Sequence, residues 1–577
     1  MVRFFFLLTA IIVLAISGRA QQITTLFETS NGKQTPEYPD IIKWWQQLDQ
    51  ASDKVSMQAV GMTDAGYPLH LVMVSNQPMT GFEAAHQQGK TVLLINNGIH
   101  PGEPDGIDAS MLLIRDIVEK KLTLPDNVVL ALIPVYNIGG CLNRSSLYRV
   151  DQDGPEAFGS RGNSQNLDLN RDFIKCDTKD AFAFTEIFHR VDPDIFIDNH
   201  VSNGADYQHV MTLLTSQHNK LGGKMGEFMN RRFEPALYQL MGKEGFDLIP
   251  YVNDFGDSVT NGWAGFWDSP RYASGYATLF QSFAFVPETH MLKPYPQRVK
   301  ATYALMKSFI TFAKENGITI RQLRKEARAA LLHTEAFPVS FRLDSSAAGT
   351  ITFKGYEAIR KKSAVSGLPR LYYDRSRPFT RQIPFHNQYI PERLVRKPKA
   401  YVIPQGWWKV IDRLKANKVI LEPLTRDTTI GVETYYITKY RSSPAPYQMH
   451  HANTDVEVET KKQSLHFWKG DWLIPMNQTA NRFLFETLEP YCEDSYFAWN
   501  FFDGILNNKE WYSAYNYEDI AAEQLKKDTT LRKALEAKRT ADPAFAGNAA
   551  AQLTFIFDQS PYKDPDFMRY PVYRIVD

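Results

Sequence analysis

The chain has 577 residues, which is too long for one ordinary domain, so we expect two or three domains. Its apolar fraction of 44% and its charged fraction of 22% are normal for a globular protein with a large core. The net charge of +1 provides no field that would attract nucleic acid or an anionic membrane surface, so we expect neither as a partner.

The first twenty residues, MVRFFFLLTAIIVLAISGRA, differ from the rest of the chain. A basic Arg3, an apolar stretch from Phe4 to about Ile16 and small residues near Ala20 predict a signal peptide that is cut after Ala20. The alternative is an uncleaved anchor helix, although the apolar stretch is shorter than the ~20 residues that a membrane span needs. No later segment is long and apolar enough to cross a membrane. We therefore expect an exported protein, periplasmic or extracellular, without an integral membrane segment after signal cleavage.

The chain contains three cysteines, Cys141, Cys176 and Cys492. So few cysteines in an exported protein exclude a fold that depends on a disulfide framework, although one bridge is possible. Their spacing contains no Cys-X-X-Cys pair, so a thiolate metal site is not expected either.

Residues from about 40 to 330 alternate between short apolar runs and longer stretches with helical spacing. The short runs read as buried strands and are TVLLI, VVLALIPV, DIFID and SFAFV. The longer stretches read as helices and are GIDASMLLIRDIVEKK, KDAFAFTEIFHRV and QRVKATYALMKSFITFAKENG. Buried strands that alternate with helices predict an α/β fold with a largely parallel sheet flanked by helices.

After about residue 335 the pattern changes to half-exposed strands, and from about 478 to 545 it becomes helical again. We therefore predict a signal peptide over residues 1–20, a first domain over 21–332 and an accessory region over 333–577. The accessory region is expected to be β-rich to about residue 475 and then helical. It is interpreted either as a packed accessory domain or as a lid or binding surface for peptide or peptidoglycan.

Polar residues stand at the ends of three predicted strands. His100 and Glu103 follow TVLLI, His200 follows DIFID, and Glu288 follows SFAFV. A lone His-X-X-Glu is expected roughly once by accident in such a chain, but the carboxyl ends of parallel strands share one edge of a sheet. Two imidazoles and a carboxylate suit a catalytic zinc ion. The competing interpretation is a turn or core histidine, a carboxylate at a helix N-terminus and a salt-bridge partner.

Four motifs in the same order now identify a resemblance that covers residues from about 40 to 315. They are HPGE at 100–103, NLDLNRDF at 166–173, DNH at 198–200 and VPETH at 286–290. With them the sequence resembles the zinc carboxypeptidases, the carboxypeptidase A-like metallopeptidases. The resemblance implies a carboxypeptidase-like mixed sheet, one zinc ion per chain held by His100, Glu103 and His200, and Glu288 as the catalytic glutamate.

The resemblance also implies residues that bind the substrate. Asn170 and Arg171 match the pair that grips the terminal carboxylate of a peptide, and a guanidinium fits a carboxylate bidentately. Arg161 matches the arginine that polarises the scissile carbonyl, with Arg149 as the alternative. Arg171 could instead form a structural pair with a neighbouring aspartate.

The family closes its site with a tyrosine upstream of the catalytic glutamate, but this chain has no clear match for it. Tyr272 and Tyr276 are the available candidates. They belong to the aromatic stretch 263–276, which is expected either to line a substrate pocket or to fill the core.

We therefore expect an exported zinc metallocarboxypeptidase that hydrolyses C-terminal peptide bonds of peptides with a free C-terminus. Its zinc ion would lower the pKa of a water molecule toward ~7, and Glu288 would act as general base. Two alternatives remain open. One is a zinc amidase or peptidase that acts on cell-wall peptides, or a deacylase of N-acyl amino acids. The other is a catalytically silent protein that binds peptide or glycan.

Overall fold

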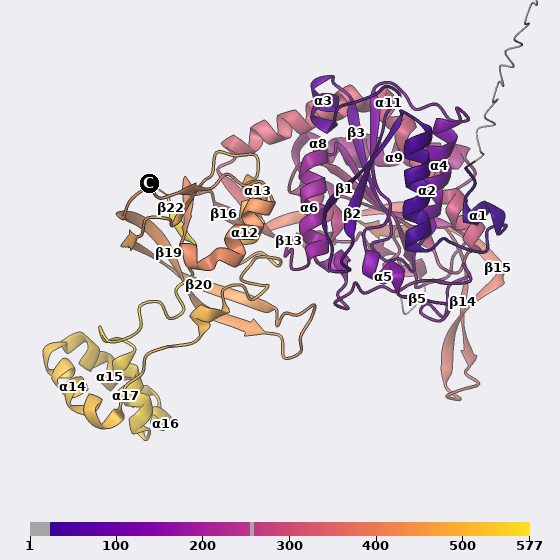
Figure 1. Ribbon diagram of the computed structural model, residues 1–577. Helices are drawn as coiled ribbons and strands as arrows, with labels where there is room; N and C mark the ends of the chain where they lie inside the picture. Colours follow the sequence, from indigo (N-terminus) through magenta and orange to yellow (C-terminus); the bar gives the residue numbers. More distant parts are fainter. Residues whose placement is uncertain (1–22, 254–258, 577) are drawn as a thin grey trace, which may run out of the picture.

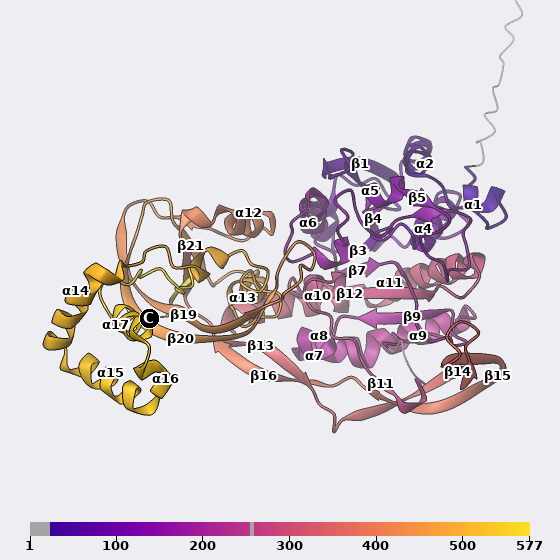
Figure 2. The same ribbon diagram turned by 90° about the horizontal axis from the view of Figure 1, so that it is seen from below.

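The computed structural model describes residues 23–253 and 259–576 (Figure 1). The predicted signal peptide at residues 1–20 lies outside the described residues. The described part consists of a large α/β unit, a β-rich region beside it and a lobe of helices near the C-terminal end (Figures 1 and 2).

The α/β unit is built on a nine-stranded sheet with the order β1-β2-β4-β3-β7-β12-β9-β10, and β8 pairs with β12. Its strands are β1 (Val55–Met62), β2 (Pro68–Val74), β3 (Thr91–Asn96), β4 (Val128–Ile133), β7 (Ile195–Asp198), β8 (His200–Ser202), β9 (Met211–Thr215), β10 (Ile249–Pro250) and β12 (Phe283–His290). Strands β4, β3, β7 and β12 run parallel to one another, whereas β1, β2 and β9 join by antiparallel pairing. The sheet is therefore mixed and largely parallel, as predicted.

The central strands are apolar throughout because both faces of the sheet are covered by helices. One face packs against α2 (Tyr38–Ala51), α4 (Asp105–Val118), α8 (Gly223–Phe228), α9 (Glu234–Lys243) and α11 (Tyr295–His333). The other face packs against α3 (Phe82–Gln87), α6 (Lys179–Val191) and α10 (Ala273–Thr278). Shorter helical segments are α1 (Leu26–Thr29), α5 (Ile138–Leu142), α7 (His218–Leu221), the 3₁₀ turns Leu169–Arg171 and Val259–Asn261, and the π-helical turn Met229–Phe233.

The β-rich region follows directly on α11, which is longer than its predicted span of 297–317. It holds the pair β13 (Ala336–Leu343) with β16 (Tyr389–Arg396) and the ribbon β14 (Ala348–Lys362) with β15 (Pro369–His386), which β11 (Trp263–Ala264) extends. A six-stranded sheet contains β17 (Ala400–Ile403), β18 (Glu422–Pro423), β19 (Thr428–Ser442), β20 (Asn453–Phe467), β21 (Trp472–Pro475) and β22 (Tyr573–Ile575). Helices α12 (Trp408–Ala416) and α13 (Asn481–Leu488) accompany it.

The hydrophobic core under α6 and α10 continues into this β-rich region without interruption. Phe280 of the α/β unit lies 5.3 Å from the ring of Phe483 on α13, and both side chains are buried. Burial of shared apolar area stabilises the contact by about 25 cal/mol per Å². The two regions are therefore joined by a common core.

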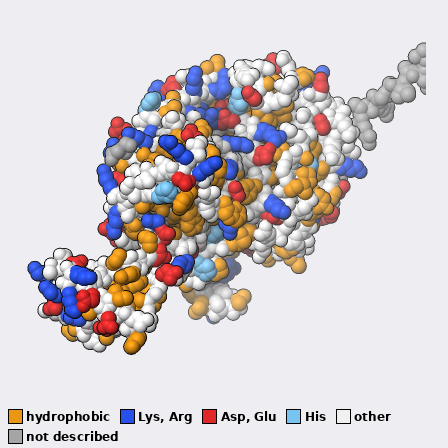
Figure 3. Space-filling view, turned by 60° about the vertical axis from the view of Figure 1, so that its left-hand side comes forward, with side chains coloured by type: hydrophobic (Ala, Val, Ile, Leu, Met, Phe, Trp, Pro, Cys, Tyr) orange, Lys and Arg blue, Asp and Glu red, His pale blue; other side chains and the backbone are white. Residues whose placement is uncertain are grey.

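The helical lobe has a separate small core. It consists of α14 (Ala514–Lys527), α15 (Thr529–Ala541), α16 (Pro543–Ala546) and α17 (Ala549–Phe557). Asp528 ends α14 and caps α15 by accepting hydrogen bonds from the backbone N–H groups of Thr530 and Leu531. The lobe projects from the rest of the molecule and carries both basic and acidic side chains on its surface (Figure 3).

All three cysteines are free and buried, so the disulfide that the sequence left open is not formed. Within the described residues, no helix combines the length and the apolar character required for a membrane span.

Candidate metal centre and substrate cavity

The polar residues at the strand ends meet at one edge of the sheet, because β3, β7 and β12 are parallel neighbours and their carboxyl ends lie together. His100 and Glu103 lie in the loop between β3 and α4, and His200 begins β8. Glu288 is paired in register with His200, but it lies inside β12 rather than after its end, because the strand continues to His290. All four side chains line one cavity of about 480 Å³.

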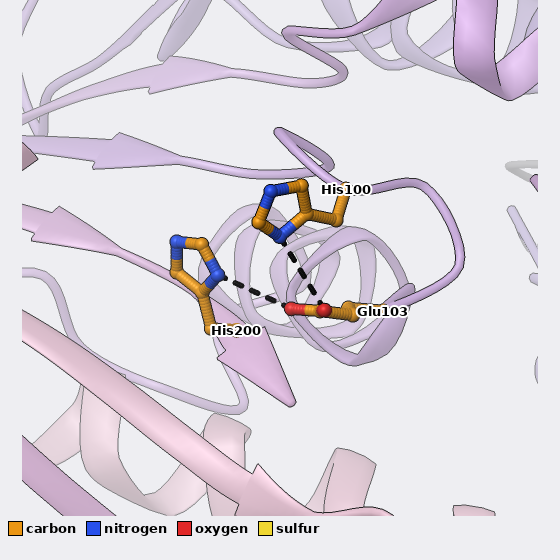
Figure 4. A group of neighbouring side chains, drawn as sticks. All are labelled: His100, Glu103 and His200. Carbon is orange, nitrogen blue, oxygen red and sulfur yellow. Dashed lines mark hydrogen bonds and ion pairs between the residues drawn. The ribbon is translucent and has the colours of Figure 1, made fainter. Parts of the chain in front are cut away.

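Three of these side chains face a common point (Figure 4). Nδ1 of His100 lies 3.3 Å from Oε1 of Glu103, and Nδ1 of His200 lies 3.1 Å from Oε2 of the same carboxylate. One donor atom from each residue lies within 4.8 Å of the other two. All three side chains are buried, and Nδ1 of His100 has no hydrogen-bond partner. An orphaned imidazole nitrogen beside a second imidazole and a carboxylate fits a zinc ion.

Two further carboxylates hold the imidazoles from behind. Nε2 of His100 donates to Oδ1 of Asp168 over 2.8 Å, and Nε2 of His200 donates to Oδ2 of Asp198 over 2.9 Å. A proton held at Nε2 leaves the lone pair of each Nδ1 directed at the common point, which is how proteins orient metal-binding histidines. Neither Asp168 nor Asp198 was predicted from the sequence to take this role.

We call the group of His100, Glu103 and His200 the metal corner of the cavity. Its electrostatics favour a bound cation. Burial opposes the charged form of His200, but Asp198, Glu103 and Glu288 together hold the pKa of its imidazole well above the usual range. Burial likewise opposes the ionised form of Glu103, yet Arg149 and the two histidines keep the pKa of this carboxyl well below its usual range. The centre therefore carries an ionised carboxylate and stabilises positive charge beside it.

The two candidate arginines are held differently. Arg149 donates from Nε to Gln152, from Nη1 to Oε1 of Glu103 over 2.8 Å, and from Nη2 to the carbonyl of Val201. All three of its nitrogens are thus engaged by the protein. Arg161 is about half exposed; its Nε and Nη2 each lie 2.9 Å from Oδ2 of Asp168, and its Nη1 is 3.6 Å from Glu103. Arg161 is therefore the more accessible of the two arginines, and its Nη1 is the donor that a substrate can reach.

The HPGE motif permits this packing. A Cβ atom on Gly102 would lie 2.9 Å from Cδ of Arg149 and 3.0 Å from the carbonyl oxygen of Gly159. A side chain at position 102 would push Arg149 away from Glu103, so the glycine is required for the close approach.

Asn170 and Arg171 lie in a 3₁₀ turn at the edge of the same cavity. Oδ1 of Asn170 is buried without a hydrogen-bond partner. The guanidinium carbon of Arg171 lies 4.6 Å from the centre of the Tyr272 ring, and Nη1 donates to the carbonyl of Asn170. Its nearest approach to Asp168 is 3.9 Å, so the structural pair considered from the sequence is weak.

Comparison with known proteins agrees with this geometry. The family model described as zinc carboxypeptidase matches residues 41–206, a range that holds the three candidate metal ligands together with Asn170 and Arg171. Proteins named carboxypeptidase 2 from Trichophyton rubrum and Trichophyton equinum are each 21% identical over 431 residues, which cover 70% of this chain and 72% of the fungal chains. Residues 41–206 therefore match the zinc carboxypeptidase family, and the fungal relatives carry the similarity over most of the chain. The chain is a metallocarboxypeptidase, a peptide hydrolase that uses zinc.

Solved structures of carboxypeptidases are also similar to this enzyme. A metallo-carboxypeptidase from Pseudomonas aeruginosa has a TM-score of 0.37 at 14% identity, covering 48% of this chain and 68% of that chain. Carboxypeptidase A from Helicoverpa armigera has a TM-score of 0.36 at 15% identity, covering 52% and 75%.

The aromatic stretch 263–276 divides between the cavity of the carboxypeptidase and its core. Phe266 and Tyr272 line the cavity. Tyr276 is fully buried and donates its hydroxyl proton to Asn417, so it is not available to a substrate. Of the two tyrosines proposed from the sequence, the structure places only Tyr272 at the site.

Proposed function

We propose that this carboxypeptidase is exported and removes C-terminal residues from peptides, with a zinc ion held by His100, Glu103 and His200. The supporting observation is that one cavity holds this donor set and, at its edge, Asn170 and Arg171. A zinc ion bound there would supply Lewis-acid polarisation and would lower the pKa of water. Export is proposed from the sequence of residues 1–20 alone.

Arg171 and Asn170 are proposed to bind the terminal carboxylate. A guanidinium offers a planar fork of donors that matches two carboxylate oxygens. Holding the carboxylate at this edge of the cavity places the last peptide bond toward the metal corner. This positioning distinguishes an exopeptidase from an enzyme that cuts within a chain.

Glu288 is proposed to be the general base. It lines the cavity in register with His200. Burial raises the pKa of its carboxyl group to about 8, with Glu103 adding to the rise and His200 opposing it. A group that binds a proton near neutral pH can take it from the attacking water and return it to the leaving amine.

Arg161 is proposed to stabilise the negative charge that develops on the scissile carbonyl oxygen. Its half-exposed guanidinium lies between Asp168 and Glu103 and retains donors for a substrate. Arg149 is proposed to hold Glu103 in place, because its nitrogens already bond to the protein.

The test is zinc content together with hydrolysis of a small panel by the purified full-length protein. The panel contains one peptide as its free acid, the same peptide as its amide, and a muropeptide. We expect about one zinc ion per chain, cleavage of the free acid, and loss of activity when a chelator removes the metal. Cleavage of the amide at the same rate would contradict the carboxylate grip, and cleavage of the muropeptide alone would move the function to cell-wall processing.

A further inference from the structure

The turn between β19 and β20 extends from the β-rich region to Arg171, a residue that lines the substrate cavity. Tyr447 and His450 close the turn through two backbone hydrogen bonds, of 2.7 Å from Tyr447 N–H and 3.0 Å from His450 N–H. Gln448 and Met449 between them have φ values of 50° and 69°. Positive φ at both central residues is the type I′ conformation of a two-residue hairpin loop. Contacts outside the turn add to its stability.

Those contacts are made with the loop that carries Asn170 and Arg171. The hydroxyl of Tyr447 accepts a 2.7 Å hydrogen bond from Nε of Arg171. Oε1 of Gln448 accepts from the backbone N–H of Asp168 over 2.9 Å, and Nε2 of His450 donates to Asp177 over 2.8 Å. Three of the four turn residues thus bond to a segment more than 270 positions earlier in the chain.

The turn is supported from behind by Trp499. The Tyr447 and Trp499 rings are near parallel, with an interplanar angle of 19° and centres 6.3 Å apart, and His450 meets the same indole edge-on at 5.5 Å. Trp499 is buried and donates from its indole N–H to Asp494. A rigid support of this kind restricts Tyr447 to the position beside Arg171.

The arrangement leaves part of Arg171 free. Nε is taken by Tyr447 and Nη1 by the carbonyl of Asn170, while the Tyr272 ring lies beside the guanidinium. Across residues 23–253 and 259–576, Nη2 of Arg171 donates no hydrogen bond to the protein. A guanidinium fixed at two nitrogens presents its remaining donors in one orientation, which lowers the entropy lost when a carboxylate binds.

We propose that Tyr447 is a positioning residue of the carboxypeptidase site, and that through it the β-rich region sets the affinity for the free C-terminus of the substrate. The proposal rests on the carboxylate grip of Arg171 that is part of the proposed function. It gives the β-rich region a role in substrate binding in addition to packing.

The test compares Tyr447→Phe with the wild-type holoenzyme. This variant keeps the ring on Trp499 and removes only the hydroxyl that accepts from Arg171. Tyr436→Phe is the matched control, because it removes a hydroxyl from the same β19–β20 hairpin whose partner is Gln463. Arg171→Ala serves as the reference for complete loss of the grip. For each protein, KM and kcat are measured on a short peptide acid, and Ki is measured for the amide of that peptide as a competitor.

Loss of a hydrogen bond to a charged group is expected to raise KM for the acid by about five- to tenfold in Tyr447→Phe. We expect kcat and the Ki of the amide to stay within about twofold of wild type, and Tyr436→Phe to match wild type. An unchanged KM in Tyr447→Phe beside a raised KM in Arg171→Ala would overturn the proposal. A lowered KM would show that the turn competes with the substrate, and an equal rise in the Ki of the amide would show a structural role only. If Arg171→Ala leaves KM unchanged, Arg171 does not bind the terminal carboxylate, and the proposed role of Tyr447 is then excluded as well.

Discussion

The two ends of the substrate cavity are built in different ways. The metal corner takes its donors from the ends of neighbouring strands of one sheet, and the side chains of His100, Glu103 and His200 are almost fully buried. The carboxylate end takes Arg171 from a short turn and Tyr447 from a hairpin of another region, and both are more exposed. Chemistry that needs fixed geometry is thus placed on the sheet, and substrate recognition is placed where two regions meet.

The largest predicted effect concerns the metal corner. Glu288→Gln removes the proposed base and is expected to reduce kcat by about 10³-fold, while the zinc content stays at the wild-type level. Steady-state kinetics and metal analysis measure both quantities. Glu315→Gln, on the exposed surface of α11, is the matched control. A Glu288→Gln protein with normal turnover would remove Glu288 from the mechanism.

Two arginine variants compare the ends of the cavity directly. Arg161→Ala is expected to lower kcat by about 10²-fold, because it removes a donor for the developing oxyanion. Arg171→Ala is expected to raise KM for a peptide acid by a similar factor, because it removes the contact with the carboxylate. Steady-state kinetics on one acid separate the two effects. If both variants change the same constant, the proposed division of roles is wrong.

The next prediction tests whether the carboxylates that bond to the two histidines support zinc binding. Asp198→Asn removes the charge that holds Nε2 of His200 and is expected to weaken zinc binding by about 10- to 100-fold. Competition with a fluorescent chelator measures this affinity. Asp519→Asn, an exposed substitution on the helical lobe, should leave it unchanged. Equal zinc affinity in both variants would contradict the role assigned to Asp198.

A separate prediction concerns stability at the contact between the regions. Burial opposes ionisation of Asp177, but its hydrogen bond with His450 and the charge of Lys175 hold its pKa well below the usual range. A carboxyl group with a depressed pKa stabilises the fold above its unfolded pKa of about 3.9, and this stabilisation is lost as the pH falls below that value. Asp177→Asn is therefore expected to lower the free energy of unfolding by about 3 kcal/mol at pH 7.

Thermal denaturation at several pH values checks this prediction. The difference in Tm between wild type and Asp177→Asn should be largest at neutral pH and should shrink below pH ~4. Asp455→Asn, which changes an exposed aspartate paired with Arg441, is the control and should have little effect. A difference that does not depend on pH would mean that the charge of Asp177 is not what stabilises the contact.

The metal corner could be predicted from the sequence because its signals are local. Each donor stands beside an apolar run, and parallel strands bring such positions to one edge. The role of Asp198 also had a local signal, since it stands two residues before His200. The position of Glu288 inside β12 was missed because the apolar run ends at Val286, whereas the strand continues to His290. Glu288 is polar within the strand because it lines the cavity.

The carboxylate end could be predicted only in part. The NLDLNRDF motif identified Asn170 and Arg171 as candidates, but no periodicity or spacing connects them with Tyr447, which is 276 positions from Arg171. Tyr276 was a candidate because it precedes Glu288, yet its place on α10 turns it into the core beside Phe188. Long-range pairing of this kind depends on how two regions dock, which local patterns do not encode.

The turn with left-handed backbone at Gln448 and Met449 restricts which insertions and deletions homologues can accept. Most surface loops tolerate insertions and deletions, and the helical lobe offers several places for them. The hairpin tip at 447–450 cannot change length in this way, because a shift of one residue would turn Tyr447 away from Arg171. In homologues that keep the pairing, we expect side chains to vary along β19 and β20 while the number of residues between them stays fixed.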